Sequence, residues 1–397
     1  MRQLKIPAVF MRGGTSNAIV FNAKDLPRDR AEWDPIFLAA IGSPDPYGRQ
    51  LDGMGGGVSS LSKVCVVGPP TRDDADIDYT FAQVQVKEAK VDYGGNCGNM
   101  SSAVGPFAVD EGLVNASGPE ALVRIHNTNT KKIIWSRFSL DGGMAAVDGD
   151  LAIPGVPGTG APVKLEFREP GGATTGRLLP TGNVADTLHV PGFGKIIVSM
   201  IDAANACVFA RADDLGVEGT ELPDGIDADR DLLGKLAAIR IAASVAMGIA
   251  GSADEAARNA MVPFVGFVSP PRDARTLSGE TLAGARVDLT ARMLSNGQAH
   301  RALPLTASLC IAVAARLPGS VVFDAMRPAG DPESEIRIGM PSGVLTVAAT
   351  VRKLEGGWYA EQGAFFRTQR RMFEGDVLVR AASAPHLVAA SGTRRRD

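Results

Sequence analysis

The second half of this chain repeats the first, and that repeat constrains the fold more than any other feature. Short segments of the first half recur in the second half in the same order. Residues 17–21 match 205–209, 38–41 match 236–239, 64–70 match 265–271, and 97–104 match 306–313. The separation between partners only grows along the chain, as expected if two homologous halves diverged by small insertions. We therefore predict two similar domains, joined near residues 180–190, with a ligand site in the cleft between them.

Each half shows the same expected order of elements. A β-branched strand comes first, then a helix with apolar residues at helical spacing, a strand that ends at Pro-Pro, and a helix of small residues. In the first half these elements are residues 18–21, 31–41, 63–67 and 98–109; in the second half they are 206–209, 231–247, 264–268 and 307–315. Because helices and antiparallel strands mix without a regular alternation, the pattern predicts an α+β fold.

Composition excludes several classes of protein. The 397 residues carry a formal net charge of −3, so no general basic field attracts nucleic acid. No apolar stretch approaches the ~18 residues that a membrane helix needs, and no signal core follows the N-terminus. The 4 cysteines form no CxxC pair, which argues against a local zinc site. We expect a cytoplasmic enzyme that binds neither membranes nor nucleic acid.

The stretch around Cys97 carries the sharpest chemical signal. Two glycines turn the chain at 94–95, and a helix of small residues starts just after the cysteine. The unpaired N–H groups and the dipole of that helix favour a thiolate at Cys97, and with Gly98 and Asn99 they could hold a substrate carboxylate. The alternative is a structural cysteine that merely caps the helix.

A second stretch centres on Lys63, where a glycine-rich loop enters an apolar strand. The loop lacks the ending of a phosphate-binding loop, and it enters a strand where a dinucleotide fingerprint would leave one. Backbone amides near Ser60 could approach an anion. A lysine that loses hydration at a strand entry can act as a general base or as a clamp for a dienolate. A lysine that snorkels from the strand end remains the alternative.

Weaker candidates for substrate binding lie in other parts of the sequence. Gly14, Thr15 and Ser16 form a glycine turn that suits carboxylate binding, although an ordinary turn would look the same. Arg272 follows the second Pro-Pro and is a possible further anion contact, and Thr306 occupies the position equivalent to Cys97.

The remaining reactive residues are expected to have structural roles or to lie at the surface. A racemase with one thiol on each face of its substrate would need a cysteine at 306, so that mechanism is disfavoured. Cys310 is expected in the core and His300 in a structural role, and Arg367 and Arg370 are expected at the surface.

Taken together, the motifs at 11–16, 42–46, 50–56, 62–63 and 96–99 resemble those of the PrpF-like family, and shorter matches continue in order to 374–375. This family includes 2-methylaconitate isomerase, 3-methylitaconate Δ-isomerase and 4-oxalomesaconate tautomerase. The resemblance implies a diaminopimelate-epimerase-like fold: two pseudo-symmetric domains, each a curled, mostly antiparallel sheet around a central helix.

The resemblance also implies boundaries, cofactors and roles. The first domain would span 1–185 and be completed by a C-terminal strand near 376–397, and the second would span 186–375. Lysine and cysteine residues matching Lys63 and Cys97 would be the acid and base, with no metal, pyridoxal phosphate or nucleotide. A homodimer is expected from the fold class.

The expected function is an allylic proton shift on a small unsaturated polycarboxylate. One departure from many relatives, Asn17 in place of lysine, removes a positive charge near the proposed anion site and leaves the substrate open. Two alternatives stay open: a racemase or epimerase of an amino or hydroxy acid, and a non-enzymatic accessory protein of an aconitase-like enzyme.

Overall fold

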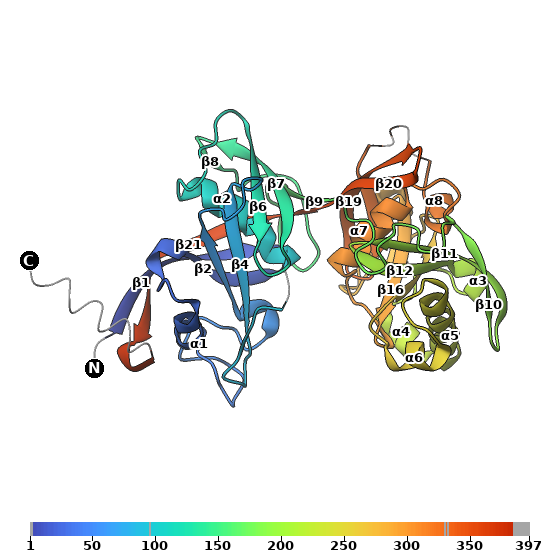
Figure 1. Ribbon diagram of the computed structural model, residues 1–397, viewed down its shortest axis with the longest axis horizontal. Helices are drawn as coiled ribbons and strands as arrows, with labels where there is room; N and C mark the ends of the chain where they lie inside the picture. Colours follow the sequence, from blue (N-terminus) through green and yellow to red (C-terminus); the bar gives the residue numbers. More distant parts are fainter. Residues whose placement is uncertain (1–2, 95–96, 329–330, 332, 384–397) are drawn as a thin grey trace, which may run out of the picture. The chain divides into compact units, whose positions relative to one another are not determined.

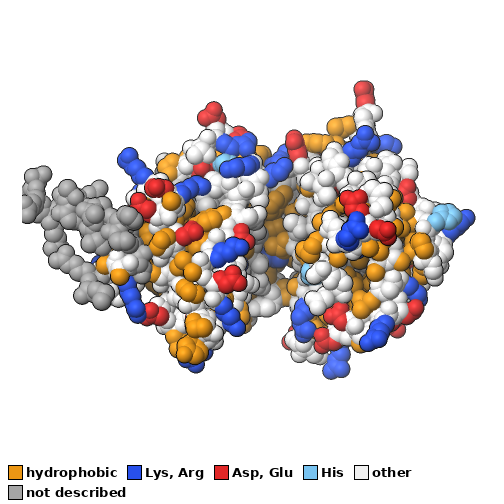
Figure 2. Space-filling model, turned by 60° about the horizontal axis from the view of Figure 1, so that its bottom comes forward, with side chains coloured by type: hydrophobic (Ala, Val, Ile, Leu, Met, Phe, Trp, Pro, Cys, Tyr) orange, Lys and Arg blue, Asp and Glu red, His pale blue; other side chains and the backbone are white. Residues whose placement is uncertain are grey.

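A computed structural model describes residues 3–94, 97–328, 331 and 333–383 (Figure 1). The chain divides into two compact units, one made of residues 1–165 and 367–397 and the other of residues 166–366. None of the helices in the described residues is long and apolar enough to span a membrane. On the face shown in Figure 2, acidic and basic side chains are intermixed over both units, in keeping with the small net charge.

The two units share one order of strand pairing. In the first unit β2 (Ser16–Asn22) runs parallel to β3 (Lys63–Gly68), β3 antiparallel to β4 (Ile77–Val84), and β4 parallel to β6 (Glu120–Asn127). The second unit repeats this pattern: β12 (Asn205–Arg211) runs parallel to β13 (Phe264–Ser269), β13 antiparallel to β16 (Leu289–Ser295), and β16 parallel to β18 (Ile336–Met340). This repeated topology agrees with the repeat in the sequence.

The flanking strands extend the repeat. The antiparallel pair β1 (Gln3–Gly13) and β2 corresponds to β11 (Gly194–Ala203) and β12, and the pair β6 and β7 (Lys132–Asp141) corresponds to β18 and β19 (Gly343–Leu354). Most pairings are therefore antiparallel, and the fold is a mixed α and β one, as predicted. The short hairpin strands β5 (Val91–Asp92) and β17 (Gln298–Ala299) also occupy equivalent places.

Helices lie where the sequence predicts them. In the first unit α1 (Trp33–Ile41) joins β2 to β3, and α2 (Gly98–Asp110) precedes β6. In the second unit α5 (Arg230–Ala246) and α7 (Leu305–Ala314) take these two places. Every residue of α2 from Met100 to Val109 is buried. A Cβ atom at Gly105 would lie only 2.6 Å from Ser136 Oγ, so a glycine lets α2 approach β7 closely.

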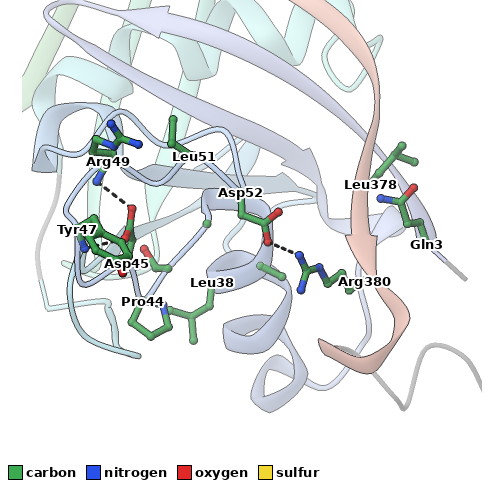
Figure 3. Close-up of a pocket in the computed structure, with 13 residues that line it drawn as sticks. Gln3, Leu38, Pro44, Asp45, Tyr47, Arg49, Leu51, Asp52, Leu378 and Arg380 are labelled. Atoms are coloured by element: carbon green, nitrogen blue, oxygen red, sulfur yellow. Dashed lines mark hydrogen bonds and ion pairs between the residues drawn. The ribbon is translucent and has the colours of Figure 1, made fainter. Parts of the chain in front are cut away.

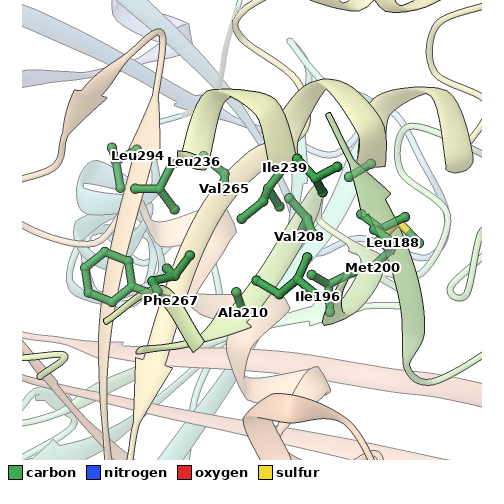
Figure 4. Packing of buried hydrophobic residues seen from close by; sticks show 14 of the residues in the cluster. Leu188, Ile196, Met200, Val208, Ala210, Leu236, Ile239, Val265, Phe267 and Leu294 are labelled. Atoms are coloured by element: carbon green, nitrogen blue, oxygen red, sulfur yellow. The ribbon is translucent and has the colours of Figure 1, made fainter. Parts of the chain in front are cut away.

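The apolar core of the second unit forms between α5 and the sheet. Leu236 and Ile239 on α5 pack against Val208, Val265 and Phe267 on strands β12 and β13 (Figure 4). Each such fully buried side chain contributes about 1.5–3 kcal/mol of transfer free energy. An equivalent cluster joins α1 to the sheet of the first unit.

The chain passes from the first compact unit to the second at residues 165–166 and returns at 366–367. The segment after Glu166 belongs to the second unit because the buried Asp202 carboxylate accepts hydrogen bonds from the backbone N–H groups of Thr174 and Thr175 and from Thr175 Oγ1. At the other end, β21 (Gln369–Arg380) pairs along the whole length of β1, from Gln3 to Gly13. In Figure 1 the red strand β21 runs beside the blue strand β1.

Candidate active site

Strand β3 presents Lys63 and Cys65 on the face of the sheet opposite to α1. Val64 and Val66 belong to the core cluster around α1, and alternate residues of a strand point to opposite faces. Helix α2 lies against the other face, where Tyr79 contacts both Cys65 and Ser101 of α2. The alternation of β3 therefore directs the lysine toward the side of the sheet on which α2 begins.

Lys63 is a buried residue at the start of its strand. Only 7% of its surface is exposed, although it is the first residue of β3. Its Nζ atom donates a hydrogen bond to Gln83 Oε1 and lies 5.1 Å from the centre of the Phe81 ring. The amine is therefore held by a neutral amide and an aromatic ring, and its role as an acid or base stays a prediction.

Cys97 caps the start of α2. Its backbone is extended, with φ −107° and ψ 98°, and the Met100 N–H donates to its Sγ atom at 3.5 Å. Cys97 is partly exposed, whereas Cys65, Cys207 and Cys310 are buried. The turn expected just before it includes Gly95 and Asn96, which lie outside the described residues.

The thiol of Cys65 is influenced by both Lys63 and Cys97. Burial raises the pKa of the Cys65 thiol, the charge of Cys97 raises it further, and the charge of Lys63 opposes this shift. Burial likewise raises the pKa of Tyr79, with Cys65 and Cys97 adding to the effect. Lys63 and Cys97 thus both act electrostatically on the same buried thiol of the first unit.

The turn between β1 and β2 packs on the first residues of α2. Gly14 has φ +51°, and a Cβ atom there would lie 2.3 Å from Asn99 Oδ1, so this turn requires glycine. Asn99 Nδ2 donates to Thr15 Oγ1 at 3.1 Å, and Arg367 Nε donates to Asn99 Oδ1 at 3.1 Å. Ser16 is buried at the start of β2, and Thr15 is exposed.

Arginine side chains make the surroundings of this turn positive. Arg367 is 8% exposed, and burial lowers its pKa to about 10, so it still carries its charge at neutral pH. Arg12 donates to the carbonyl oxygens of Gly14 at 2.9 Å and Thr368 at 3.0 Å. Burial, and then the charge of Arg370, lower the pKa of Arg12. Together with the N-terminus of α2, these cations form a region that attracts carboxylates.

Comparison with known proteins places the chain in a family. The sequence profile of the PrpF family, described as "PrpF protein", matches residues 3–380. The chain belongs to the PrpF family. A 3-methylitaconate isomerase of Eubacterium barkeri is 44% identical over 382 residues, which cover 96% of this chain and 98% of the relative. A 2-methyl-aconitate isomerase of Cupriavidus necator is 39% identical over 388 residues, covering 95% and 98% of the two chains.

The solved structures include a relative of similar extent. A crystal structure of methylitaconate-delta-isomerase matches with a TM-score of 0.88 at 44% identity and covers 97% of this chain and 98% of that one. These full-length relatives are isomerases, which shows the class of enzyme to which this PrpF-family chain belongs.

The predicted site residues of this PrpF-family chain fall into two groups. In the first unit the structure brings Gly14, Thr15 and Ser16 together with Gly98 and Asn99 at the start of α2. Lys63 and Cys97 lie in the same unit, and Ser60 lies in the 3-10 turn Ser59–Leu61 that precedes Lys63.

Arg272 and Thr306 belong to the second unit. Arg272 forms an ion pair with Asp213 at 3.3 Å, and Thr306 is exposed in the first turn of α7. Their part in substrate binding stays a prediction.

The predicted core position of Cys310 in the second unit is confirmed, and the structural role expected for His300 stays a prediction. Cys310 is fully buried, as expected for a core residue. His300 is half-buried, shares a hydrogen bond of 2.8 Å with Ser295 Oγ, and has a pKa lowered by burial, so it is neutral at pH 7.

The prediction that Arg367 lies at the surface is wrong. The residue sits just before β21, where the chain returns to the first unit, and its side chain is buried against Asn99. No local pattern marks this position, because the contact joins residues 268 apart in the sequence. Only the expected return of the last strand to the first domain could have suggested it.

A surface pocket of about 380 Å³ lies elsewhere in the first unit (Figure 3). It is lined by residues near the end of α1, by the following loop, and by the ion pair of Arg380 with Asp52 at 2.8 Å. It shares no lining residue with the predicted site. Among the described residues, no three His, Cys, Asp or Glu side chains gather as a metal-binding group.

Proposed function

We propose that this PrpF-family chain shifts a double bond in a small unsaturated di- or tricarboxylate, such as 2-methylaconitate, methylitaconate, aconitate or oxalomesaconate, with Lys63 and Cys97 as the acid–base pair. The observation that carries the proposal is that a buried lysine and a helix-capping cysteine are both close enough to Cys65 to act electrostatically on its thiol. The names and the extent of the relatives support the substrate class.

The proposed reaction is an allylic 1,3-proton shift, in which a proton leaves one carbon and a proton is added to the carbon two positions away. A base removes a proton from the carbon vinylogous to a carboxylate, and the electron pair of the C–H bond delocalises to form a dienolate. An acid then protonates the carbon two positions away, so that the double bond moves and no electrons are gained or lost. Either Lys63 or Cys97 can be the base in this scheme, with the other as the acid.

The charged surroundings would stabilise the intermediate. The substrate carboxylates would sit near the N-terminus of α2 and the buried Arg367, whose positive charge opposes the negative charge that develops on the dienolate. The hydrogen bonds from Asn99 to Thr15 and from Arg367 to Asn99 would keep these donors in place before the substrate arrives.

The substrate class can be tested by incubating the purified chain with each of the named polycarboxylates and recording the ultraviolet change as the double bond moves. We expect turnover of at least one compound, with deuterium from D2O appearing at the new C–H position. Deuterium exchange at a stereocentre without movement of a double bond would favour an epimerase, and no turnover of any compound would contradict the proposal.

Thiol alkylation provides a second prediction. At pH 8, iodoacetamide should modify Cys97 alone and abolish activity, because Cys65, Cys207 and Cys310 are buried. The raised pKa of Cys65 also keeps that thiol protonated and unreactive until the pH approaches its shifted value. Peptide mass spectrometry locates the label, and a bound polycarboxylate should slow its incorporation. Full activity after complete labelling of Cys97 would exclude a role for its thiol.

A further inference from the structure

We propose that Gln83 is a positioning residue for Lys63, an inference that rests on the proposed function. Its side-chain amide fixes the place of the lysine amine while leaving that amine free to exchange a proton. Gln83 belongs to none of the motifs that point to the family, and the proposed reaction assigns it no role.

The sheet places the two residues face to face. Lys63 and Gln83 are direct partners in the antiparallel pair of β3 and β4, so their side chains leave the same face of the sheet side by side. The Lys63 Nζ atom donates to Gln83 Oε1. The contact therefore follows from strand register and does not depend on a mobile loop.

The orientation of the Gln83 amide is determined by its other partners. Gln83 Nε2 donates to the carbonyl oxygens of Ser59 and Ser62, each at 3.0 Å. Carbonyl oxygens only accept hydrogen bonds, so the NH₂ group must face them and Oε1 must face Lys63. Ser59 is the first residue of the 3-10 turn Ser59–Leu61 and Ser62 directly follows it, so the same amide also ties the end of the glycine-rich loop to the sheet.

The neutrality of this acceptor matters for the chemistry. A carboxylate beside Lys63 would hold the amine in its protonated form, whereas an amide oxygen accepts one N–H without adding a charge. The Phe81 ring, 5.1 Å from Nζ, attracts a cation but cannot take a proton. Gln83 thus holds the amine in place without capturing the proton that the amine must release or return.

The test compares Gln83→Glu and Gln83→Leu with Gln85→Glu, which adds the same charge two residues further along the chain. Gln83→Glu is nearly isosteric and should move the limb of the kcat/KM pH profile that reports Lys63 to higher pH by about 1 unit or more. The limb of the pH profile should move to higher pH whether Lys63 acts as the acid or as the base, because the added carboxylate favours the protonated amine in both cases. Gln85→Glu should leave that limb close to its wild-type position.

Gln83→Leu removes the acceptor and should lower kcat by roughly 10- to 100-fold with a smaller change in KM, because the amine is no longer held in place. A normal pH profile for Gln83→Glu, in a chain that melts at the wild-type temperature, would overturn the proposal even if Gln83→Leu fails to fold. The Lys63→Met variant keeps the two proposals separate: if it retains activity, the assignment of Lys63 fails. If Lys63→Met is inactive while both Gln83 variants behave as wild type, only the positioning role fails.

Discussion

Replacing Cys97 with serine is expected to lower kcat by about 10²- to 10⁴-fold, because the thiol is one of the two groups proposed to carry the proton. Serine is a favoured residue at a helix N-cap, so this variant preserves the cap at the start of α2. We therefore expect thermal unfolding at or above the wild-type temperature together with a collapse of the steady-state rate. This combination separates a catalytic thiol from a cysteine that only caps the helix.

Cys310→Ala is the matched control for this prediction. It also removes a thiol, but from the buried α7 in the second unit, and should leave the rate close to that of the wild type. If Cys97→Ser retained nearly full activity, Cys97 would be a structural cap, and the acid–base assignment would fall with it.

The second large effect is expected at Lys63. Lys63→Met keeps an unbranched apolar side chain of similar length but removes the amine that lies over the Phe81 ring, and kcat should fall by about 10²- to 10⁴-fold. Lys63→Arg should not restore the rate, because a guanidinium stays protonated and cannot exchange a proton at neutral pH. Steady-state kinetics on the best substrate of the panel, with circular dichroism to verify folding, measures both variants.

Lys24→Met is the appropriate control, since Lys24 lies exposed after β2 and outside the predicted site. A folded Lys63→Met enzyme with the same kcat as Lys24→Met would show that the amine of Lys63 is not needed for proton transfer.

The order of elements could be predicted because its signals are local. The strands beginning near Ala18 and Lys63 have β-branched runs bounded by turns, and two adjacent glycines in the sequence precede the helix after Cys97. The repeated segments added a long-range constraint, since equivalent segments of two halves should take equivalent places. The strand pairings of the two units agree with that inference.

The parts that could not be predicted depend on contacts between distant residues. Arg367 is buried against Asn99 because the chain returns to the first unit, and no short stretch of sequence around either residue indicates this contact. Gln83 contacts Lys63 because of strand register, and one residue of slippage would turn its side chain to the other face. The segment around Thr174 is held in the second unit by the distant Asp202, an interaction with no motif of its own.

The pairing of β21 with β1 sets the order in which a newly made chain can mature. Strand β21 is synthesised long after β1, yet it pairs with β1 along eleven registered positions from Gln3 to Gly13. The second unit, whose residues are contiguous, can assemble while synthesis continues. The first unit, which holds Lys63 and Cys97, must keep one edge of β1 unpaired until β21 has been made, so it completes its sheet only after the whole second unit has been synthesised.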